Sequence, residues 1–354
     1  MSNTNLTKLA NGENHKHLMN TSTRQVLLAD EALYYFLLVN LWGPALAVCI
    51  LGIFTNILNI IVFSKQGLRD TVNISLFGLA TSDLGSLITL LYANISFMPA
   101  FMALDLPFVG SDVMYISTLC HLIFTRVSTW ITAYITLERC LCVTAPLRVK
   151  NLFTPKRTVL YLIVVYVLMI ASACPMFYTT RPAKIFNPLK NRTLFGISFI
   201  EDRNKIEAIG FMTNNTIPTL AFCTVAICTA ILVSTLRKKS KWRRKTTTST
   251  ANTVVADRDG KVVKIVVLIS TVFIICYLPG TAVFVYMMLD SDLRIDGFHK
   301  NIVIAVFSVL FHLESINAGV NIFIYLSMSS KYRVTFMYVM CFKCDTVSWW
   351  KRPK

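Results

Sequence analysis

The sequence predicts an all-α membrane protein, a seven-transmembrane helix bundle with a short amphipathic helix after the seventh span. Hydrophobic residues make up 55% of the 354 residues, only 15% are charged, and the mean hydropathy is +0.58. This composition is more apolar than that of a soluble domain. A helix needs about 20 apolar residues to cross a bilayer. Seven segments meet this length, approximately at residues 35–63, 73–98, 111–143, 157–178, 208–236, 261–289 and 300–327.

The chain is expected to consist of three parts. Residues 1–34 form a polar extracellular tail, residues 35–328 form the seven spans with short connections, and residues 329–354 form a cytoplasmic amphipathic helix and tail. No internal repeat of about three helices is visible, which argues against the transporters built from such repeats. A single membrane domain is therefore predicted.

The distribution of Lys and Arg sets the orientation. Of the 35 basic residues, 23 lie toward the side that holds the tail and the connections after the first, third and fifth spans, and 12 lie toward the other side. By the positive-inside rule the N-terminus is outside and the C-terminal tail is cytoplasmic. The net charge of +17 then serves topology and contact with lipid, and no nucleic acid partner is expected.

Glycosylation sequons support the same orientation. Asn5, Asn20 and Asn191 each begin an Asn-x-Ser/Thr triplet and all fall on the predicted outside, so they are candidate glycosylation sites. The triplet at Asn73 falls on the cytoplasmic side and is expected to stay unmodified.

Polar side chains lie at mid-membrane depth in four spans, namely Asn56, Asp83, Ser128, Asn317 and Asn321. A single Ser or Asn there often bonds a neighbouring helix, yet an intramembrane ionisable group is a functional candidate by default. Asp83, Ser128, Asn317 and Asn321, supported by Asn56, predict a buried cluster that suits a small hard cation such as sodium, whose charge offsets the carboxylate. The alternative is a protonated Asp83 that donates a hydrogen bond.

A second polar group lies at the inner end of the third span. Arg139 follows Glu138, and Asp259 is expected at the inner end of the sixth span. An isolated Arg at this depth could simply reach lipid phosphates. An Arg held by carboxylates that can release it is instead a two-state latch.

Short motifs occur in a fixed order along the spans: Leu79 to Asp83, Glu138-Arg139-Cys140, Pro146-Leu147, Pro218, Cys276-Tyr277-Leu278-Pro279 and Asn317 to Tyr325. In order and spacing they resemble the motifs of the rhodopsin-like (class A) G-protein-coupled receptors, such as Asp/Glu-Arg-Tyr, Cys-Trp-x-Pro and Asn-Pro-x-x-Tyr. The resemblance covers about residues 40 to 340.

The resemblance implies a multi-pass receptor of the plasma membrane that binds an extracellular ligand and activates a heterotrimeric G protein. Pro279 removes a backbone hydrogen bond and makes the sixth helix a kinked lever. Tyr277, one turn away, then senses the ligand. Glu138, Arg139, Asp259, Asn321 and Tyr325 form the switch that reorganises at the inner face.

The chain also departs from the family pattern. The family usually joins the top of the third helix to the second outer loop by a disulfide. In this chain the position on the third helix holds Met114, and the loop residues 179–206 contain no Cys. The outer loop must therefore be held by other contacts or be mobile, and a Cys120–Cys174 bridge is an open alternative. Tyr277 and Ile322 replace the usual Trp and Pro. This divergence looks most like invertebrate (molluscan-type) chemosensory receptors and their neuropeptide-receptor relatives.

Five residues are candidate ligand contacts. His121 and Thr125 share the inward face of the third helix, and Tyr277 lies opposite on the sixth. Arg126 and Glu314 are the ionisable groups expected in the outer half to middle of the bundle. They either pair with each other, or Arg126 attracts an anionic ligand group and Glu314 a cationic one.

The segment after the seventh span mixes basic and apolar residues at helical spacing over 329–340, which predicts a helix lying on the inner leaflet. Cys341 and Cys344 follow it and are candidate palmitoylation sites, with free thiols as the alternative.

Other classes of seven-span protein fit less well. A channel or transporter is the alternative function, but it requires a continuous polar path. A retinal protein needs a Lys in the seventh helix, and residues 301–328 contain none. A membrane enzyme needs a clustered nucleophile and base or a metal set, so no enzymatic activity is predicted and no cofactor beyond the sodium ion is expected.

Overall fold

The computed structural model describes residues 28–96, 98–188, 191–245, 253–289 and 297–340. The side chains of residues 239–245 and 253–261 lie outside this description. The predicted modification sites Asn5, Asn20, Cys341 and Cys344 also lie outside the described residues.

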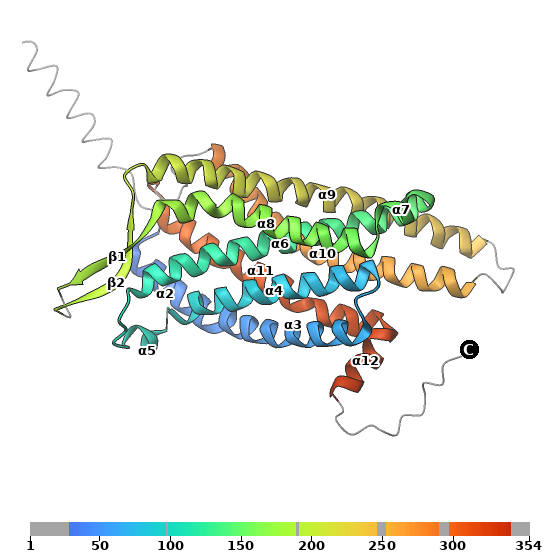
Figure 1. Cartoon of the computed structure of the whole chain (residues 1–354), viewed down its shortest axis with the longest axis horizontal. Helices are drawn as coiled ribbons and strands as arrows, with labels where there is room; N and C mark the ends of the chain where they lie inside the picture. Colours follow the sequence, from blue (N-terminus) through green and yellow to red (C-terminus); the bar gives the residue numbers. More distant parts are fainter. Residues whose placement is uncertain (1–27, 97, 189–190, 246–252, 290–296, 341–354) are drawn as a thin grey trace, which may run out of the picture.

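Seven long helical segments run side by side along the molecule (Figure 1). They are the continuous segment α2–η1–α3 (Asp30–Asn40, Leu41–Ala45, Leu46–Gln66), α4 (Thr71–Ser96), α6 (Gly110–Thr144), α8 (Pro155–Thr179), α9 (Arg203–Lys245), α10 (Thr253–Leu289) and α11 (Lys300–Met328). Each predicted span falls on one of these segments, so the predicted seven-helix fold is confirmed. The first helix begins at Asp30, within the range expected for the tail.

The helix α6 differs from the other six segments in composition. Six segments of the described chain are long and apolar enough to cross a membrane, and α6 is not among them. It packs against α4, α8, α9 and α10, and its buried polar residues include Thr129, Thr132 and Thr136. A helix surrounded by other helices can carry such groups because they find partners across the interface.

Local sequence determines where the helices begin and end. The first span stops at Gly67, which adopts a φ of +87° that favours glycine. The helix α8 begins after Thr154, whose hydroxyl accepts a hydrogen bond from the Arg157 N–H, with Pro155 at its first position.

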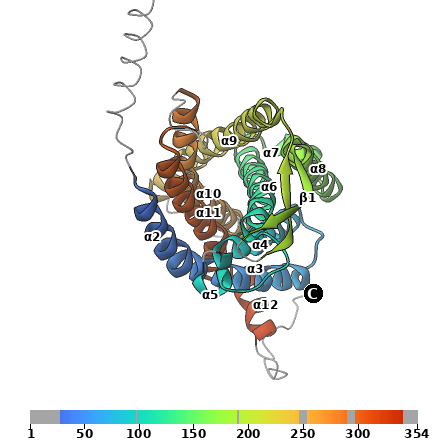
Figure 2. The same ribbon diagram turned by 90° about the vertical axis from the view of Figure 1, so that its left-hand side faces the viewer.

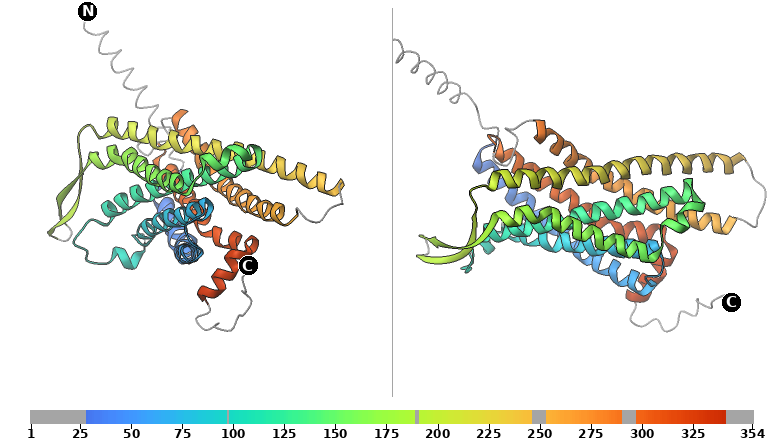
Figure 3. Two further views of the ribbon diagram at one scale, coloured as in Figure 1. Left: turned by 45° about the vertical axis from the view of Figure 1, so that its right-hand side comes forward. Right: turned by 45° about the horizontal axis from the view of Figure 1, so that its top comes forward.

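Short elements lie at the two ends of the bundle. At one end are α5 (Pro99–Met102) and a hairpin of β1 (Thr180–Asn187) and β2 (Arg192–Phe199); at the other are α7 (Pro146–Leu152) and α12 (Ser330–Met340). Figure 2 views the molecule from the hairpin end, and Figure 3 shows α12 turning away from α11 at the opposite end. The predicted helix after the seventh span corresponds to α12.

The hairpin is held by hydrogen bonds instead of a disulfide. Phe195 accepts from the Val109 N–H (2.8 Å) and donates to the Pro107 carbonyl (3.0 Å), which ties β2 to the segment before α6. Arg192 adds an ion pair with Asp105 at 2.5 Å. The sequence left open whether this loop is held or mobile, and in the structure it is held.

The first and seventh segments approach closely through two glycines. A Cβ on Gly319 would lie 3.4 Å from the Gly52 Cα, at van der Waals contact, so this close approach leaves little room for a side chain larger than that of alanine. Asn56 uses this proximity by donating from Nδ2 to the Ala318 carbonyl at 2.9 Å. Small residues and interhelical hydrogen bonds are a usual means of helix packing in membranes.

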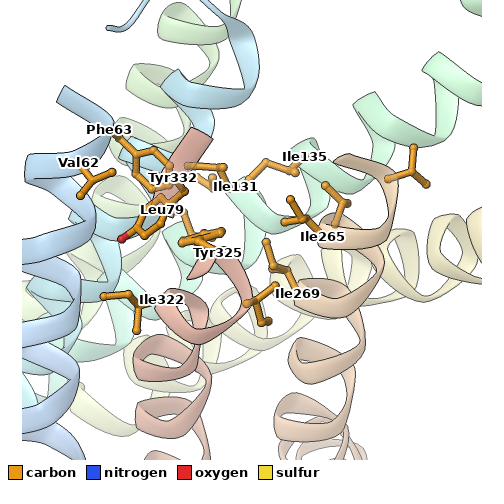
Figure 4. Close-up of a cluster of buried hydrophobic side chains, with 14 of the residues drawn as sticks. Val62, Phe63, Leu79, Ile131, Ile135, Ile265, Ile269, Ile322, Tyr325 and Tyr332 are labelled. Atoms are coloured by element: carbon orange, nitrogen blue, oxygen red, sulfur yellow. The ribbon is translucent and has the colours of Figure 1, made fainter. Parts of the chain in front are cut away.

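Figure 4 shows part of a core of apolar side chains between the helices. It gathers residues of α3, α4, α6, α8, α9, α10 and α11 around Tyr325 and Tyr332 of α12, among them Val62, Phe63, Leu79, Ile131, Ile135, Ile265, Ile269 and Ile322. The rings of Tyr325 and Tyr332 each lie within 5.5 Å of the Phe63 ring. Burial raises the pKa of the Tyr332 hydroxyl, so the neutral group donates to Asn59 Oδ1 at 2.6 Å.

Candidate functional site

A narrow cavity of about 30 Å³ lies between α6, α9, α10 and α11. Much of its wall is aromatic, with Phe222, Phe284, Phe307, Phe311 and Tyr277. The wall also includes two ionisable side chains, Arg126 of α6 and Glu314 of α11. An apolar cavity with a few polar groups is the usual form of a small-ligand or side-chain binding site.

Glu314 pairs with His121, not with Arg126. The distance from His121 Nε2 to Glu314 Oε2 is 3.1 Å, and His121 Nδ1 lies 3.0 Å from the Ser86 carbonyl oxygen. His121 is 1% exposed and does not line the cavity. The sequence-based alternative of an Arg126–Glu314 pair is therefore not what the structure forms.

Arg126 is buried with little polar contact. Its side chain is 5% exposed, and Nη2 lies 3.4 Å from Asn215 Oδ1 of α9. The guanidinium carbon lies 5.7 Å from the centre of the Phe284 ring. Nε is buried and has no hydrogen-bond acceptor among the described residues.

The remaining candidate contacts differ in their access to the cavity. Tyr277 lines it and stacks on Phe273 with ring centres 4.4 Å apart. Thr125 does not line it, because its hydroxyl is turned back to the Leu122 carbonyl of its own helix. Three of the five predicted contacts, Arg126, Tyr277 and Glu314, thus share one cavity wall.

The predicted cluster around Asp83 lies between α4, α6 and α11. Asp83 is 2% exposed; Ser128 donates to Oδ1 at 2.6 Å and Asn321 donates to Oδ2 at 3.2 Å. Ser82 lies 2.8 Å from Ser128 and adds a further hydroxyl. Asn317 is buried but makes no hydrogen bond to Asp83 in the described chain. The Asp83 carboxylate and the Ser82 and Ser128 hydroxyls are oxygen ligands of the type that a hard cation prefers, whereas Asn321 turns its amide nitrogen to the carboxylate; a sodium ion at this cluster stays a prediction.

At the inner end of α6, Glu138 holds Arg139. The Arg139 Nη2 lies 2.7 Å from Glu138 Oε1, and the same oxygen accepts from the Thr71 hydroxyl of α4 at 2.6 Å. Glu138 is 1% exposed. The predicted partner Asp259 is on α10, but its side chain lies outside the description. Pro279 lies inside α10, and Tyr325 is buried in the core of Figure 4.

Two contacts of this inner half were not anticipated from the sequence. The Thr136 and Ser270 hydroxyls meet at 2.9 Å and join α6 to α10. Tyr332 reaches Asn59 and joins α12 to the first span. Polar residues within the helices were the sequence feature that pointed to these two contacts. The spacing of residues along one helix, however, does not reveal which neighbouring helix each residue faces.

The comparison with protein families decides the class of the molecule. The model described as "7 transmembrane receptor (rhodopsin family)" matches residues 55–325, most of the chain. The chain belongs to this rhodopsin family of receptors. It is therefore a multi-pass membrane receptor of a non-enzymatic family, as the motifs indicated.

Relatives of this rhodopsin-family receptor include growth hormone secretagogue receptors and an FMRFamide receptor. It is 28% identical over 348 residues to growth hormone secretagogue receptor type 1 of Oryctolagus cuniculus, covering 89% of this chain and 85% of the relative. The Homo sapiens protein of the same name is 27% identical with the same coverage. The FMRFamide receptor of Drosophila melanogaster is 24% identical over 305 residues, covering 82% of this chain and 52% of that protein.

The cysteines of this receptor do not form the cross-link that the family pattern leads one to expect. Cys120 and Cys174 form no disulfide with each other. The Cys120–Cys174 bridge, which the sequence left open, is therefore not formed in this structure. Instead, Ile197 of β2 donates from its N–H to Asp112 Oδ2 at 2.8 Å, so an acidic residue of α6 takes over the attachment of the hairpin.

Proposed function

We propose that this chain is a plasma-membrane receptor that binds an extracellular peptide and activates a heterotrimeric G protein. The cavity between α6, α9, α10 and α11 carries the proposal, because Tyr277 in its wall lies within one turn of Pro279, the hinge expected in α10. A ligand that contacts Tyr277 can therefore bias the packing of α10.

The peptide assignment is supported by the relatives. The names of two relatives refer to a growth hormone secretagogue and to FMRFamide. The hairpin at the same end of the bundle as the cavity offers additional exposed backbone and side chains, among them Lys184 and Phe186. A ligand longer than the cavity could use these contacts.

Signalling would pass from the cavity to the inner end through α6 and α10. The Thr136–Ser270 contact and the Glu138–Arg139 pair lie at the opposite end from the hairpin. Opening of that end releases Arg139 and exposes a cleft for the G protein. Ligand binding shifts this equilibrium only by the difference in affinity between the two packings.

A small chemosensory ligand is the second candidate from the sequence. The enclosed aromatic wall of the cavity would suit it, but the relatives described above carry hormone and neuropeptide names. A channel or transporter function receives no support from the family assignment.

The deciding experiment is a ligand screen in cells that express a promiscuous G protein. A library of peptides and a library of small odorants are applied to wild-type receptor and to Arg139→Ala, with surface expression measured by an external epitope tag. A calcium response to peptides that is lost in Arg139→Ala supports the proposal. A response to odorants alone would favour the chemosensory alternative, and ion flux that persists in Arg139→Ala would favour a channel.

A further inference from the structure

We infer that the ligand of this receptor carries an anionic group, a carboxylate being the simplest, and that this group pairs with Arg126. The inference rests on the proposed function, because it assigns the ligand chemistry of the same cavity. It follows from a charge balance over the residues that surround the cavity.

The first step is the protonation of His121. A backbone carbonyl can only accept a hydrogen bond, so the His121 Nδ1 that lies 3.0 Å from the Ser86 carbonyl oxygen holds a hydrogen. Nε2 lies 3.1 Å from Glu314 Oε2. Two lone pairs would repel at this distance, so a proton lies between them.

The second step is the sum of charges. With that proton, the pair is either an imidazolium with a carboxylate or a neutral imidazole with a carboxylic acid, and both forms sum to zero. Arg126 carries a positive charge, because an Arg guanidinium is not deprotonated in proteins. The described ionisable groups of the cavity wall and the His121 behind it thus leave one uncompensated positive charge, on Arg126.

The third step is the contact of Arg126 itself. No carboxylate of the described residues lies within ion-pair distance of it, and its one side-chain acceptor is the neutral Asn215 amide at 3.4 Å. The side chain is 5% exposed and lines the cavity. A buried charge is normally paired because its desolvation is costly, so the missing anion is expected to come from the ligand.

The rest of the wall constrains what surrounds the anion. Phe284 lies under the guanidinium, and Phe222 and Leu310 line the same cavity. The ligand is therefore expected to present a carboxylate next to an aliphatic or aromatic group. A carboxylate next to an aliphatic or aromatic group occurs both at the C-terminus of a peptide and in a small organic acid, so the test must separate these two sources.

The test uses full-length receptor in lipid nanodiscs and matched pairs of acid and amide probes. N-acetyl-Phe-Phe is compared with its amide as the peptide source, and 4-phenylbutyrate with 4-phenylbutyramide as the small-acid source. We expect an acid, but not its amide, to raise the melting temperature of the wild type by roughly 2 °C at saturating concentration. Whichever acid acts identifies the source.

Three variants locate the effect. Arg126→Gln should abolish the acid-dependent shift, Arg126→Lys should retain part of it, and Arg181→Gln, which removes an exposed Arg of β1, should leave it intact. Without ligand, Arg126→Gln should melt at or above the wild-type temperature, because it removes an unpaired buried charge.

Several results would overturn the inference. These are equal shifts with acid and amide, no shift with either acid, an acid shift that persists in Arg126→Gln, or loss of the shift in Arg181→Gln. If Arg126→Gln does not fold, a reduced acid shift in folded Arg126→Lys supports the assignment and an unchanged shift contradicts it. Basal nucleotide exchange on a G protein is measured on the wild type in parallel, so failure of the ligand chemistry is distinguished from failure of the receptor function.

Discussion

The Ile197 N–H donates a 2.8 Å hydrogen bond to Asp112 Oδ2, and this bond fastens β2 to the start of α6. Gly196 makes room for it, because a Cβ at that position would lie 2.6 Å from the same oxygen. The bond works together with the Val109–Phe195 backbone pair. A covalent link is replaced by several weaker ones, so the hairpin should open more readily than a disulfide-linked loop.

The attachment of the hairpin can be tested at Asp112. Asp112→Ala leaves the Ile197 N–H without its acceptor, which should cost about 1–3 kcal/mol of stability. Hydrogen exchange at β2 should accelerate and the melting temperature should fall. Asp202→Ala serves as the control, since Asp202 is exposed and pairs with Lys205 on the surface. Equal effects of the two variants would remove Asp112 from this role.

The predicted topology can be tested at the hairpin turn. Asn191 is exposed at the tip with a φ of +46°, a conformation that Asn tolerates. If this end is extracellular, glycosidase treatment should shift the mobility of the expressed protein, and Thr193→Ala should reduce the shift, together with changes at Asn5 and Asn20. Thr193→Ser keeps the sequon and should behave as wild type. Asn73 is buried and donates to the Gly67 carbonyl, so modification at that site would contradict both the structure and the orientation.

The role proposed for Arg139 can be separated from a role in folding. Arg139→Ala should reach the cell surface, because Glu138 keeps its hydrogen bond from Thr71. It should nevertheless fail to promote nucleotide exchange on the G protein. Surface staining and a nucleotide-exchange assay measure the two properties independently. Full exchange activity in this variant would refute the proposed switch.

The Thr136–Ser270 contact predicts a change in basal activity. Ser270→Ala removes a hydrogen bond between α6 and α10 that must break when these helices separate, and Thr136 still donates to its own helix at the Thr132 carbonyl. A loss of about 0.5–1.5 kcal/mol should raise basal nucleotide exchange by about 2- to 10-fold. Thr271→Val is the matched control, because the exposed Thr271 hydroxyl donates to the Val267 carbonyl of its own helix. A rise in both variants would show that α10 is merely destabilised.

The sequence predicted the helices well because one physical requirement, the thickness of the bilayer, determines their length and composition. It also placed Asp83, Ser128 and Asn321 together, since motifs in three helices converge at one depth. It did not predict the hairpin, because Pro182 and Lys184 interrupt the alternation that marks a strand. It left the partner of Glu314 open as well, because helical periodicity gives the face of a residue and not the neighbour that the face meets.

The last prediction concerns the cation proposed at Asp83. This carboxylate is buried, receives hydrogen bonds from Ser128 and Asn321, and has no ion-pair partner among the described residues. Its charge must be neutralised by a proton or by a cation. If sodium binds, it should favour the inactive packing, because the cluster joins α4, α6 and α11 and should collapse when the bundle rearranges. Signalling should then fall as sodium replaces a larger cation at constant ionic strength, with a coupling of about 1–3 kcal/mol.

Asp83→Asn keeps the size of the side chain and should abolish this sodium dependence while leaving surface expression largely intact. Thr81→Val on the exposed face of α4 should leave the dependence unchanged, since the Thr81 hydroxyl donates to the Phe77 carbonyl of its own helix. If wild-type signalling is indifferent to sodium, a proton neutralises Asp83, and the residue is a structural hydrogen-bond donor within the bundle.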